Sequence, residues 1–194
     1  MAFFAYLITD GSYACTTPGA FAKHLGELFA AQKIDYALYR DKSNPDYERF
    51  ASVFVDECHM HGIKAMLHRD AALAVALGAD GVHLTSTQFD AVAGAKAQGL
   101  FTVVSTHSAV EAMHAAAEGA DAITYSPIFE SPGKGAPKGL EDLNETAGKI
   151  DLPVIALGGI VSPAQISAVH AAGAAGFASI RYFINSAKES FCSK

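Results

Sequence analysis

The sequence predicts a compact (β/α)8 barrel, and three features support this prediction. Eight short apolar runs, each of four to six residues, are spread along the 194 residues. Segments in which apolar residues recur at helical spacing separate most of these runs. A Gly-Ala-Asp or Ala-Gly-Ala turn precedes three of the runs, at 78–80, 119–121 and 172–174. Repeated β/α units without a linker are typical of this barrel, so we expect one domain over residues 1–194.

The predicted strands are the apolar runs, taken in chain order. Each run is continuous and apolar, as expected of a short strand that is buried on both faces of a parallel sheet. They are Phe4–Thr9, Ile34–Tyr39, Ile63–Leu67, Gly81–Leu84, Phe101–Ser105, Ala122–Tyr125, Pro153–Leu157 and Gly176–Ile180. An open, doubly wound sheet is the alternative, but the first strand is not followed by a GxGxxG phosphate loop.

The predicted helices lie between these strands and carry recognisable start signals. Ser108 and Glu111 have the spacing of a capping box, and Ser162 precedes a proline at a first helical position. The final segment, 185–194, has only ten residues, and we expect it to be frayed or covered by a partner subunit. Apolar residues at helical spacing are Phe21, Leu25, Leu28 and Phe29, then Phe50, Val53 and Phe54, then Val110, Met113 and Ala117.

Charge and composition exclude several classes of partner. The chain carries 14 basic and 20 acidic residues, and no basic run, so we expect neither nucleic acid nor an anionic membrane surface as a ligand. No apolar run approaches the roughly 18–20 residues of a membrane span. The N-terminus lacks the basic region of a signal peptide. The three cysteines form no CxxC motif and indicate reduced thiols, so we expect a cytoplasmic protein.

The expected carboxyl ends of the strands are rich in cations. In a (β/α)8 barrel, these ends and the loops that follow them form the functional face. We therefore expect an anionic ligand, most simply a phosphate, at this mouth. Six of the 14 basic residues are expected there: Arg40, Lys42, Arg69, Lys134, Lys138 and Arg181.

Two phosphate sites are predicted from these residues. Gly158 and Gly159 end the seventh strand, and Ser179, Ile180 and Arg181 end the eighth, which is the usual phosphate site of such barrels. Alternatively, the glycines only turn the chain. Arg40 and Lys42 are two residues apart on an extended segment and could hold a second phosphate, or they could form a solvated turn. Lys134 lies in a loop rich in glycine and proline and is either a mobile lid cation or an ordinary surface lysine.

The histidines offer no metal site. His83 lies within a strand and is expected to be a hydrogen-bonded core residue or a site residue. His107 follows Ser105 and either caps a helix or takes part in chemistry. The other histidines lie on predicted helices at no metal-ligating spacing, apart from His68 at a strand end.

Seven motifs, in order along nearly the whole chain, resemble the superfamily of thiamine phosphate synthases and TenI-type thiazole tautomerases. The glycine pair alone would be unspecific, but the set is not. The motifs are YLITD at 6–10, ALYRDK at 37–42, DAALAVALGADGVHL at 70–84, STH at 105–107, SPIFESPGK at 126–134, KGLEDL at 138–143 and PVIALGGI at 153–160.

The resemblance implies an enzyme of thiamine biosynthesis that couples hydroxymethylpyrimidine pyrophosphate to thiazole phosphate. It assigns the pyrophosphate to Arg40, Lys42, Ser105 and Lys134. It assigns the thiazole phosphate to the glycine pair and the end of the eighth strand. It also implies self-association, so we expect a homo-oligomer.

The chain departs from the synthase pattern at the residues expected to bind magnesium. The resemblance implies a magnesium ion held by two aspartates, but Arg69 and Gln88 occupy those positions. We therefore predict no metal-ligating residue, and regard the magnesium site as degenerate. Alternatively, Arg69 replaces the ion as a fixed cation.

Two other functions, one of them non-catalytic, stay open at this point. The TenI-type tautomerases lack the metal site, but their histidine at the end of the sixth strand aligns with Pro127. A tautomerase would have to use His68 or His107 as its acid and base, and His68 is the better candidate because it ends a strand. The third possibility is a barrel that binds a thiazole phosphate without catalysis.

Overall fold

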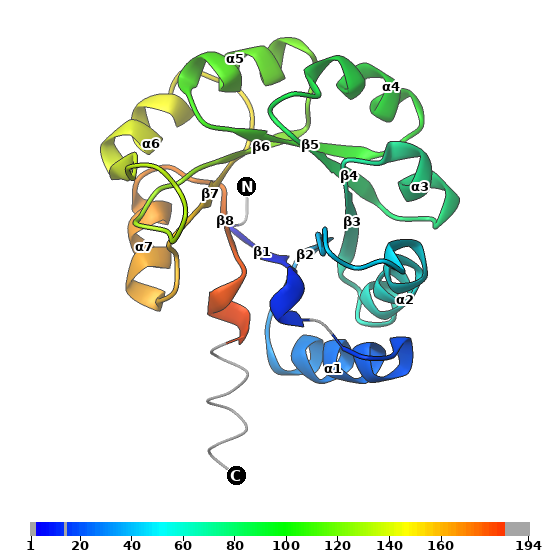
Figure 1. Ribbon diagram of the computed structural model, residues 1–194. Helices are drawn as coiled ribbons and strands as arrows, with labels where there is room; N and C mark the ends of the chain where they lie inside the picture. The colour runs from blue at the N-terminus through cyan, green and yellow to red at the C-terminus, as the bar shows by residue number, and fades with distance from the viewer. Residues whose placement is uncertain (1–2, 14, 185–194) are drawn as a thin grey trace.

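Eight parallel strands close into a barrel in sequence order, from β1 to β8 (Figure 1). The computed structural model describes residues 3–13 and 15–184. β8 pairs with β1, with Tyr6 opposite Ala178, so the sheet has no free edge. The helices lie around the outside of the strands (Figure 1). The predicted (β/α)8 barrel is therefore confirmed, whereas the predicted state of 185–194 concerns residues outside the described part.

All eight predicted strands are present, with ends that differ from the prediction by two residues at most. The strands are β1 (Phe4–Ile8), β2 (Tyr36–Tyr39), β3 (Lys64–His68), β4 (Gly81–Leu84), β5 (Phe101–Thr106), β6 (Ala122–Tyr125), β7 (Val154–Leu157) and β8 (Gly176–Ser179). The helices are α1 (Pro18–Ala31), α2 (Tyr47–Met60), α3 (Ala71–Ala76), α4 (Val92–Ala97), α5 (Ala109–Ala117), α6 (Gly139–Ala147) and α7 (Pro163–Ala171), with short 3-10 helices at Gly11–Tyr13 and Phe89–Ala91.

Two apolar clusters fill the molecule, one on each face of the sheet. Side chains alternate between the faces of a strand, so every second residue enters the barrel. The inner cluster includes Tyr6, Ile8, Leu38, Met66 and Val103. The larger outer cluster lies between the strands and the helices. No helix in the described part is long and apolar enough to cross a membrane.

The helix start signals are confirmed, but one predicted helix face is wrong. The hydroxyls of Ser108 and Ser162 cap α5 and α7 by accepting backbone N–H bonds. On α5, however, Val110 and Met113 are 71% and 46% exposed, and Ala112 and Ala115 are the buried residues. Alanines let the helix approach the strands closely, so the larger side chains turn to solvent. On α1, all four predicted apolar residues are buried, and on α2 Phe50 and Phe54 are buried while Val53 is half-buried.

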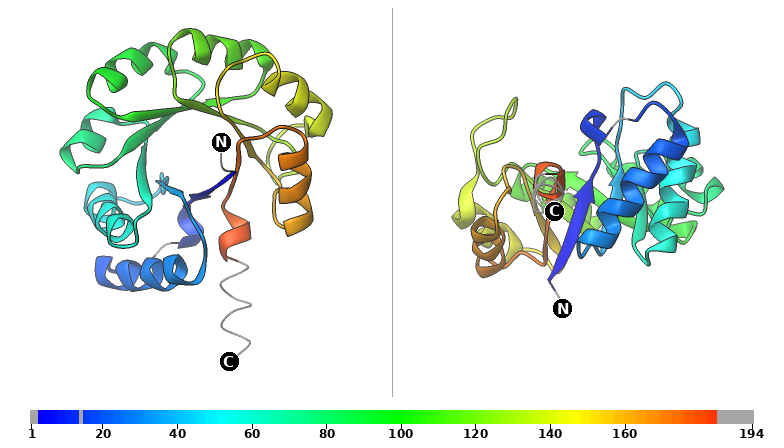
Figure 2. Two further views of the ribbon diagram at one scale, coloured as in Figure 1. Left: turned by 180° about the vertical axis from the view of Figure 1, so that it is seen from behind. Right: turned by 90° about the horizontal axis from the view of Figure 1, so that it is seen from below.

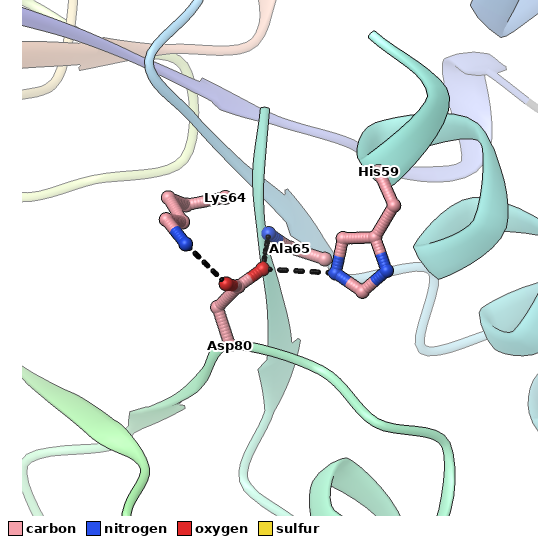
Figure 3. A network of polar contacts seen from close by, with 4 residues as sticks. All are labelled: His59, Lys64, Ala65 and Asp80. Carbon is pink, nitrogen blue, oxygen red and sulfur yellow. Dashed lines mark hydrogen bonds and ion pairs between the residues drawn. The ribbon is translucent and has the colours of Figure 1, made fainter. Parts of the chain in front are cut away.

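An aspartate before a strand holds the start of the preceding strand at three places. Asp80 accepts a hydrogen bond from the Ala65 N–H at 2.9 Å and also binds Lys64 and His59 (Figure 3). Burial alone would raise its pKa, but these three donors hold the pKa below its usual value. Asp35 and Asp121 make the same backbone contact with β1 and β5. Two of the three recurring turns in the sequence, at 78–80 and 119–121, therefore end in this cap, and Asp35 makes the same contact without such a turn.

The position before β8 is equivalent to those of Asp35, Asp80 and Asp121 but carries no aspartate. It therefore provides a test of how much this hydrogen bond contributes to stability. Ala175 precedes β8, and its N–H donates to the Val154 carbonyl at 2.9 Å, as Asp35 does to Ala5. Ala175→Asp would place a carboxylate by the Val154 N–H. We expect it to raise the free energy of unfolding by about 1 kcal/mol, the typical net value of one hydrogen bond. Urea denaturation of this variant checks the prediction. Asp35→Ala is the reciprocal control, and its free energy of unfolding should fall by at least the same amount. An Asp35→Ala variant as stable as the wild type would contradict the interpretation.

Candidate functional site

A cavity of about 510 Å³ opens at the carboxyl ends of the strands. The loop between β6 and α6 projects beyond this rim of the barrel, yellow-green in the right panel of Figure 2. The cavity is lined by residues from all eight β/α units. All eleven predicted site residues line it: Arg40, Lys42, His68, Ser105, His107, Lys134, Gly158, Gly159, Ser179, Ile180 and Arg181.

Two of the cations predicted at this mouth do not line the cavity. The Lys138 ammonium lies 5.5 Å from the centre of the Tyr125 ring, where a cation–π contact holds it on the outer side. Arg69 directly follows β3 and is absent from the lining of the cavity. It is the one described residue other than glycine with a positive φ, at 71°. Its backbone is fixed on both sides, since its N–H donates to the His83 carbonyl and the Gln88 amide donates to its carbonyl.

The cavity wall carries unpaired positive charge. Arg40, Lys42, Lys134 and Arg181 line it, and Asp10 is the one acidic residue among the lining residues. None of these cations forms an ion pair within the described part of the chain. Burial lowers the pKa of Lys42, and the charges of Arg40, Arg69 and Lys134 lower it further. A chain that is acidic overall therefore presents a cationic pocket, which favours an anionic ligand.

The glycine pair is required by both backbone shape and close packing. Gly158 and Gly159 have φ values of 102° and 70°. A Cβ on Gly159 would lie 2.5 Å from the Glu130 carbonyl oxygen, and one on Gly158 would lie 2.7 Å from Pro127 Cα. The loop after β6 therefore rests directly on the turn after β7. The glycines do more than turn the chain, because they let two loops of the cavity meet.

Several backbone N–H groups at the ends of β7 and β8 have no acceptor among the described residues. The hydrogen bonds of the described residues leave the N–H groups of Gly159, Ile160 and Arg181 free. The Ser179 hydroxyl is engaged, since it donates to the Ile160 carbonyl at 2.7 Å and accepts from the Tyr182 N–H. Ser179 therefore ties the two turns together, and the free N–H groups are the better phosphate ligands at this corner.

A buried hydrogen-bond chain forms the floor of the cavity. The Tyr6 hydroxyl lies 3.0 Å from His83 Nδ1, and His83 Nε2 lies 3.0 Å from Ser105 Oγ. Burial raises the pKa of Tyr6, so its hydroxyl keeps its proton and can donate a hydrogen bond to Nδ1. Nε2 then carries the ring proton and donates to Ser105, which leaves the Ser105 hydroxyl free to donate into the cavity. The expected core histidine is thus confirmed, and it also lines the cavity.

His68 and His107 differ in their hydrogen bonding to the rest of the protein. His107 Nδ1 donates to the Ser126 carbonyl at 3.1 Å, and its Nε2 has no hydrogen-bond partner among the described residues. Among the described residues, the His68 imidazole has no hydrogen-bond partner. Burial lowers the pKa of His68 to about 3, and the charges of Lys42, Arg40 and Arg69 add to this effect. His68 is therefore a neutral imidazole beside the cations.

The donor set does not fit the magnesium ion that the resemblance implies. Magnesium prefers carboxylate oxygens together with substrate phosphates. Asp10 is the one carboxylate on the wall, and one of its oxygens accepts hydrogen bonds from the N–H and hydroxyl of Ser12. The described residues contain no cluster of three His, Cys, Asp or Glu side chains that could hold a metal ion.

Sequence reasoning did not find the part that Tyr6 plays in the site. Its signal was present in the alternation along β1, where Tyr6 and Ile8 face inward and Asp10 reaches the rim. The same alternation on β4 turns His83 toward Tyr6. The contact joins residues 77 positions apart, so it depends on closure of the barrel and not on either segment alone.

The family model and the sequence relatives agree on one family. Residues 5–183 match the family model described as thiamine monophosphate synthase. A thiamine-phosphate synthase of Methanoculleus marisnigri is 33% identical over 187 residues, which are 93% of this chain and 87% of that protein. A putative thiamine-phosphate synthase of Geobacter sulfurreducens is 39% identical over 128 residues, which are 63% of this chain and 60% of that protein, so the match spans less than two thirds of that relative.

A solved structure supports the fold independently. The thiamine phosphate pyrophosphorylase from Pyrococcus furiosus superposes with a TM-score of 0.79, over 97% of this chain and 94% of that chain. The two sequences are 22% identical, so this likeness bears on the barrel alone.

The buried His83 predicts a stability that falls in acid. Burial lowers its pKa to about 3, and nearby His68 and Arg40 contribute. The unfolded chain takes up this proton near pH 6.5, whereas the folded chain does so only near pH 3, so stability is lost as the pH falls below about 6.5. Because of His83, the free energy of unfolding should be about 2 kcal/mol lower at pH 5 than at pH 8. Urea unfolding of the wild type and of His83→Gln between pH 5 and 8 measures this loss. If the unfolding free energy of the two proteins changed with pH in parallel, the prediction would be wrong.

Proposed function

Because the chain belongs to the thiamine monophosphate synthase family, we propose that it couples a pyrimidine methyl diphosphate to a thiazole phosphate. The products are thiamine phosphate and inorganic pyrophosphate. The observation that carries this proposal is one cavity with two separate groups of hydrogen-bond donors suited to anions. Unpaired cations from β2 and the loop after β6 form one region, and free N–H groups after β7 and β8 form the other.

The cationic region suits the departure of the diphosphate. The bond between the pyrimidine methylene carbon and the diphosphate oxygen breaks, and its electron pair goes to that oxygen. Arg40, Lys42 and Lys134 are already in place to stabilise the charge that develops there. The Ser105 hydroxyl, which accepts from His83, can donate its own proton in a hydrogen bond to a diphosphate oxygen.

The second region suits the thiazole phosphate. The N–H groups of Gly159, Ile160 and Arg181 would hold its phosphate and so fix the position of the ring. The ring nitrogen then attacks the methylene carbon, and a C–N bond replaces the C–O bond. The contact between the glycine pair and the loop after β6 keeps the two anions at a constant separation.

A proton-transfer isomerase acting on a thiazole phosphate is the second candidate. The observation that favours it is the His68 imidazole, which lines the cavity, is neutral and has no partner among the described residues. A neutral imidazole can accept a proton, and a bound phosphate would raise its pKa towards neutrality.

Loss of Lys42 should weaken the coupling reaction. Lys42→Met removes one charge-assisted contact to the diphosphate, worth about 2 kcal/mol, so kcat/KM for the pyrimidine substrate should fall at least about 10-fold. Thiamine phosphate formed from both substrates can be measured by mass spectrometry. Lys23→Met, on the exposed face of α1, is the matched control and should leave the rate unchanged. Equal rates for Lys42→Met and the wild type would exclude the assigned role.

Replacement of His68 separates the two candidate activities. An isomerase that uses this imidazole as its base should lose activity by about 100-fold or more in His68→Gln, in line with the usual contribution of general acid–base catalysis. The coupling reaction moves no proton through His68 and should keep most of its rate. The readout is isomerisation of a thiazole carboxylate phosphate without the pyrimidine, beside the coupling assay. Turnover in the first assay alone would favour the isomerase.

A further inference from the structure

Four cations elsewhere on the described chain have carboxylate partners, whereas the described cations of the cavity wall have none. Lys23, Lys64, Lys96 and Lys149 each lie within 4.0 Å of a carboxylate. In the described chain, no such partner exists for the four cations on the cavity wall or for Arg69 beside them. Positive charge that is brought together and left uncompensated favours binding of an anion of high charge.

The same arrangement opposes a divalent cation. A metal ion in this cavity would have one carboxylate, Asp10, against four positive side chains on the wall. One Asp10 oxygen already accepts two hydrogen bonds from Ser12. Like charges in a partly buried site repel more strongly than in bulk water.

Arg69 adds a positive charge whose backbone position is fixed. The residue adopts a left-handed conformation, which costs energy for a side chain other than glycine. Hydrogen bonds with His83 and Gln88 hold its backbone in that conformation. Its charge reaches the cavity wall, since Arg69 is among the cations that lower the pKa of Lys42.

We propose that this cavity binds the diphosphate group of its ligand directly on side-chain cations, without a bridging divalent metal ion. Arg40, Lys42 and Lys134 contact the diphosphate, and Arg69 supplies long-range positive charge. That the diphosphate belongs to a pyrimidine ester rests on the proposed function. Metal-free binding of the diphosphate rests on the charges alone.

Calorimetric titration with inorganic pyrophosphate tests the proposal without reference to activity. In EDTA, the wild-type protein should bind pyrophosphate, and more tightly than it binds inorganic phosphate. Added Mg²⁺ should weaken binding, because the ion competes with the protein for pyrophosphate. Binding that requires Mg²⁺ would overturn the proposal, and so would absence of binding in both conditions.

Asp10→Asn gives opposite results for the two modes of binding. The variant keeps an oxygen that can accept from Ser12, but loses the negative charge. If cations alone hold the diphosphate, removing this charge should tighten binding in EDTA by a few-fold. If Asp10 holds a metal ion, the same change should weaken binding in the presence of Mg²⁺.

Two lysine variants complete the design. Lys42→Met should weaken pyrophosphate binding in EDTA by at least about 10-fold, the equivalent of one charged hydrogen bond. Lys138→Met removes a neighbouring charge that lies outside the cavity over Tyr125, and should change binding little. Equal losses in both variants would indicate a nonspecific effect of net charge and overturn the assignment.

The result is separable from that of the coupling assay. Thiamine phosphate formation that depends on Mg²⁺, with no pyrophosphate binding in EDTA, would overturn metal-free binding and leave the proposed function intact. Tight binding in EDTA with no product under any condition would support metal-free binding and contradict the proposed function.

Discussion

The pairing register of the closed barrel determines where every chemical group of the cavity lies. Tyr6 on β1 and His83 on β4 meet across the barrel because both face inward at similar height. Arg40, His68 and Ser105 belong to the inward rows of their own strands and reach the rim. A shift of one residue in any pairing would turn that strand's inward side chains to the helix layer. The chemistry therefore depends on the closure of β8 onto β1.

Close packing between the loops after β6, β7 and β8 fixes their positions around the cavity. Gly158 and Gly159 allow the segment after β6 to lie against the turn after β7, at distances that exclude any side chain. Ser179 then ties the turn after β7 to the end of β8. The loop that carries Lys134 is thereby joined to the corner with the free N–H groups. Lys134 and the free N–H groups therefore belong to one packed unit, while Arg40 and Lys42 reach the cavity from the end of β2.

Much of this arrangement can be predicted from the sequence, because strands and loops are local features. Eight apolar runs with glycine turns indicate the barrel, and residues that follow each run indicate the rim. Properties that depend on distant contacts are harder to predict. Val110 and Met113 fit a helical face, but alanines on the other side of α5 pack closer to the strands. Lys138 follows the right loop, yet the Tyr125 ring holds it outside the cavity.

The two ends of the barrel use charge in opposite ways. At the amino ends of the strands, Asp35, Asp80 and Asp121 are satisfied by backbone N–H groups, and two of them also pair with Lys64 and Lys96. Charges that are paired in this way stabilise the fold and attract no ligand. At the carboxyl ends, the cations of the cavity wall have no carboxylate partner in the described part of the chain, an arrangement that favours an anionic ligand. An acidic protein can thus concentrate positive potential in one cavity, because its other strand-end charges are already neutralised where the fold requires them.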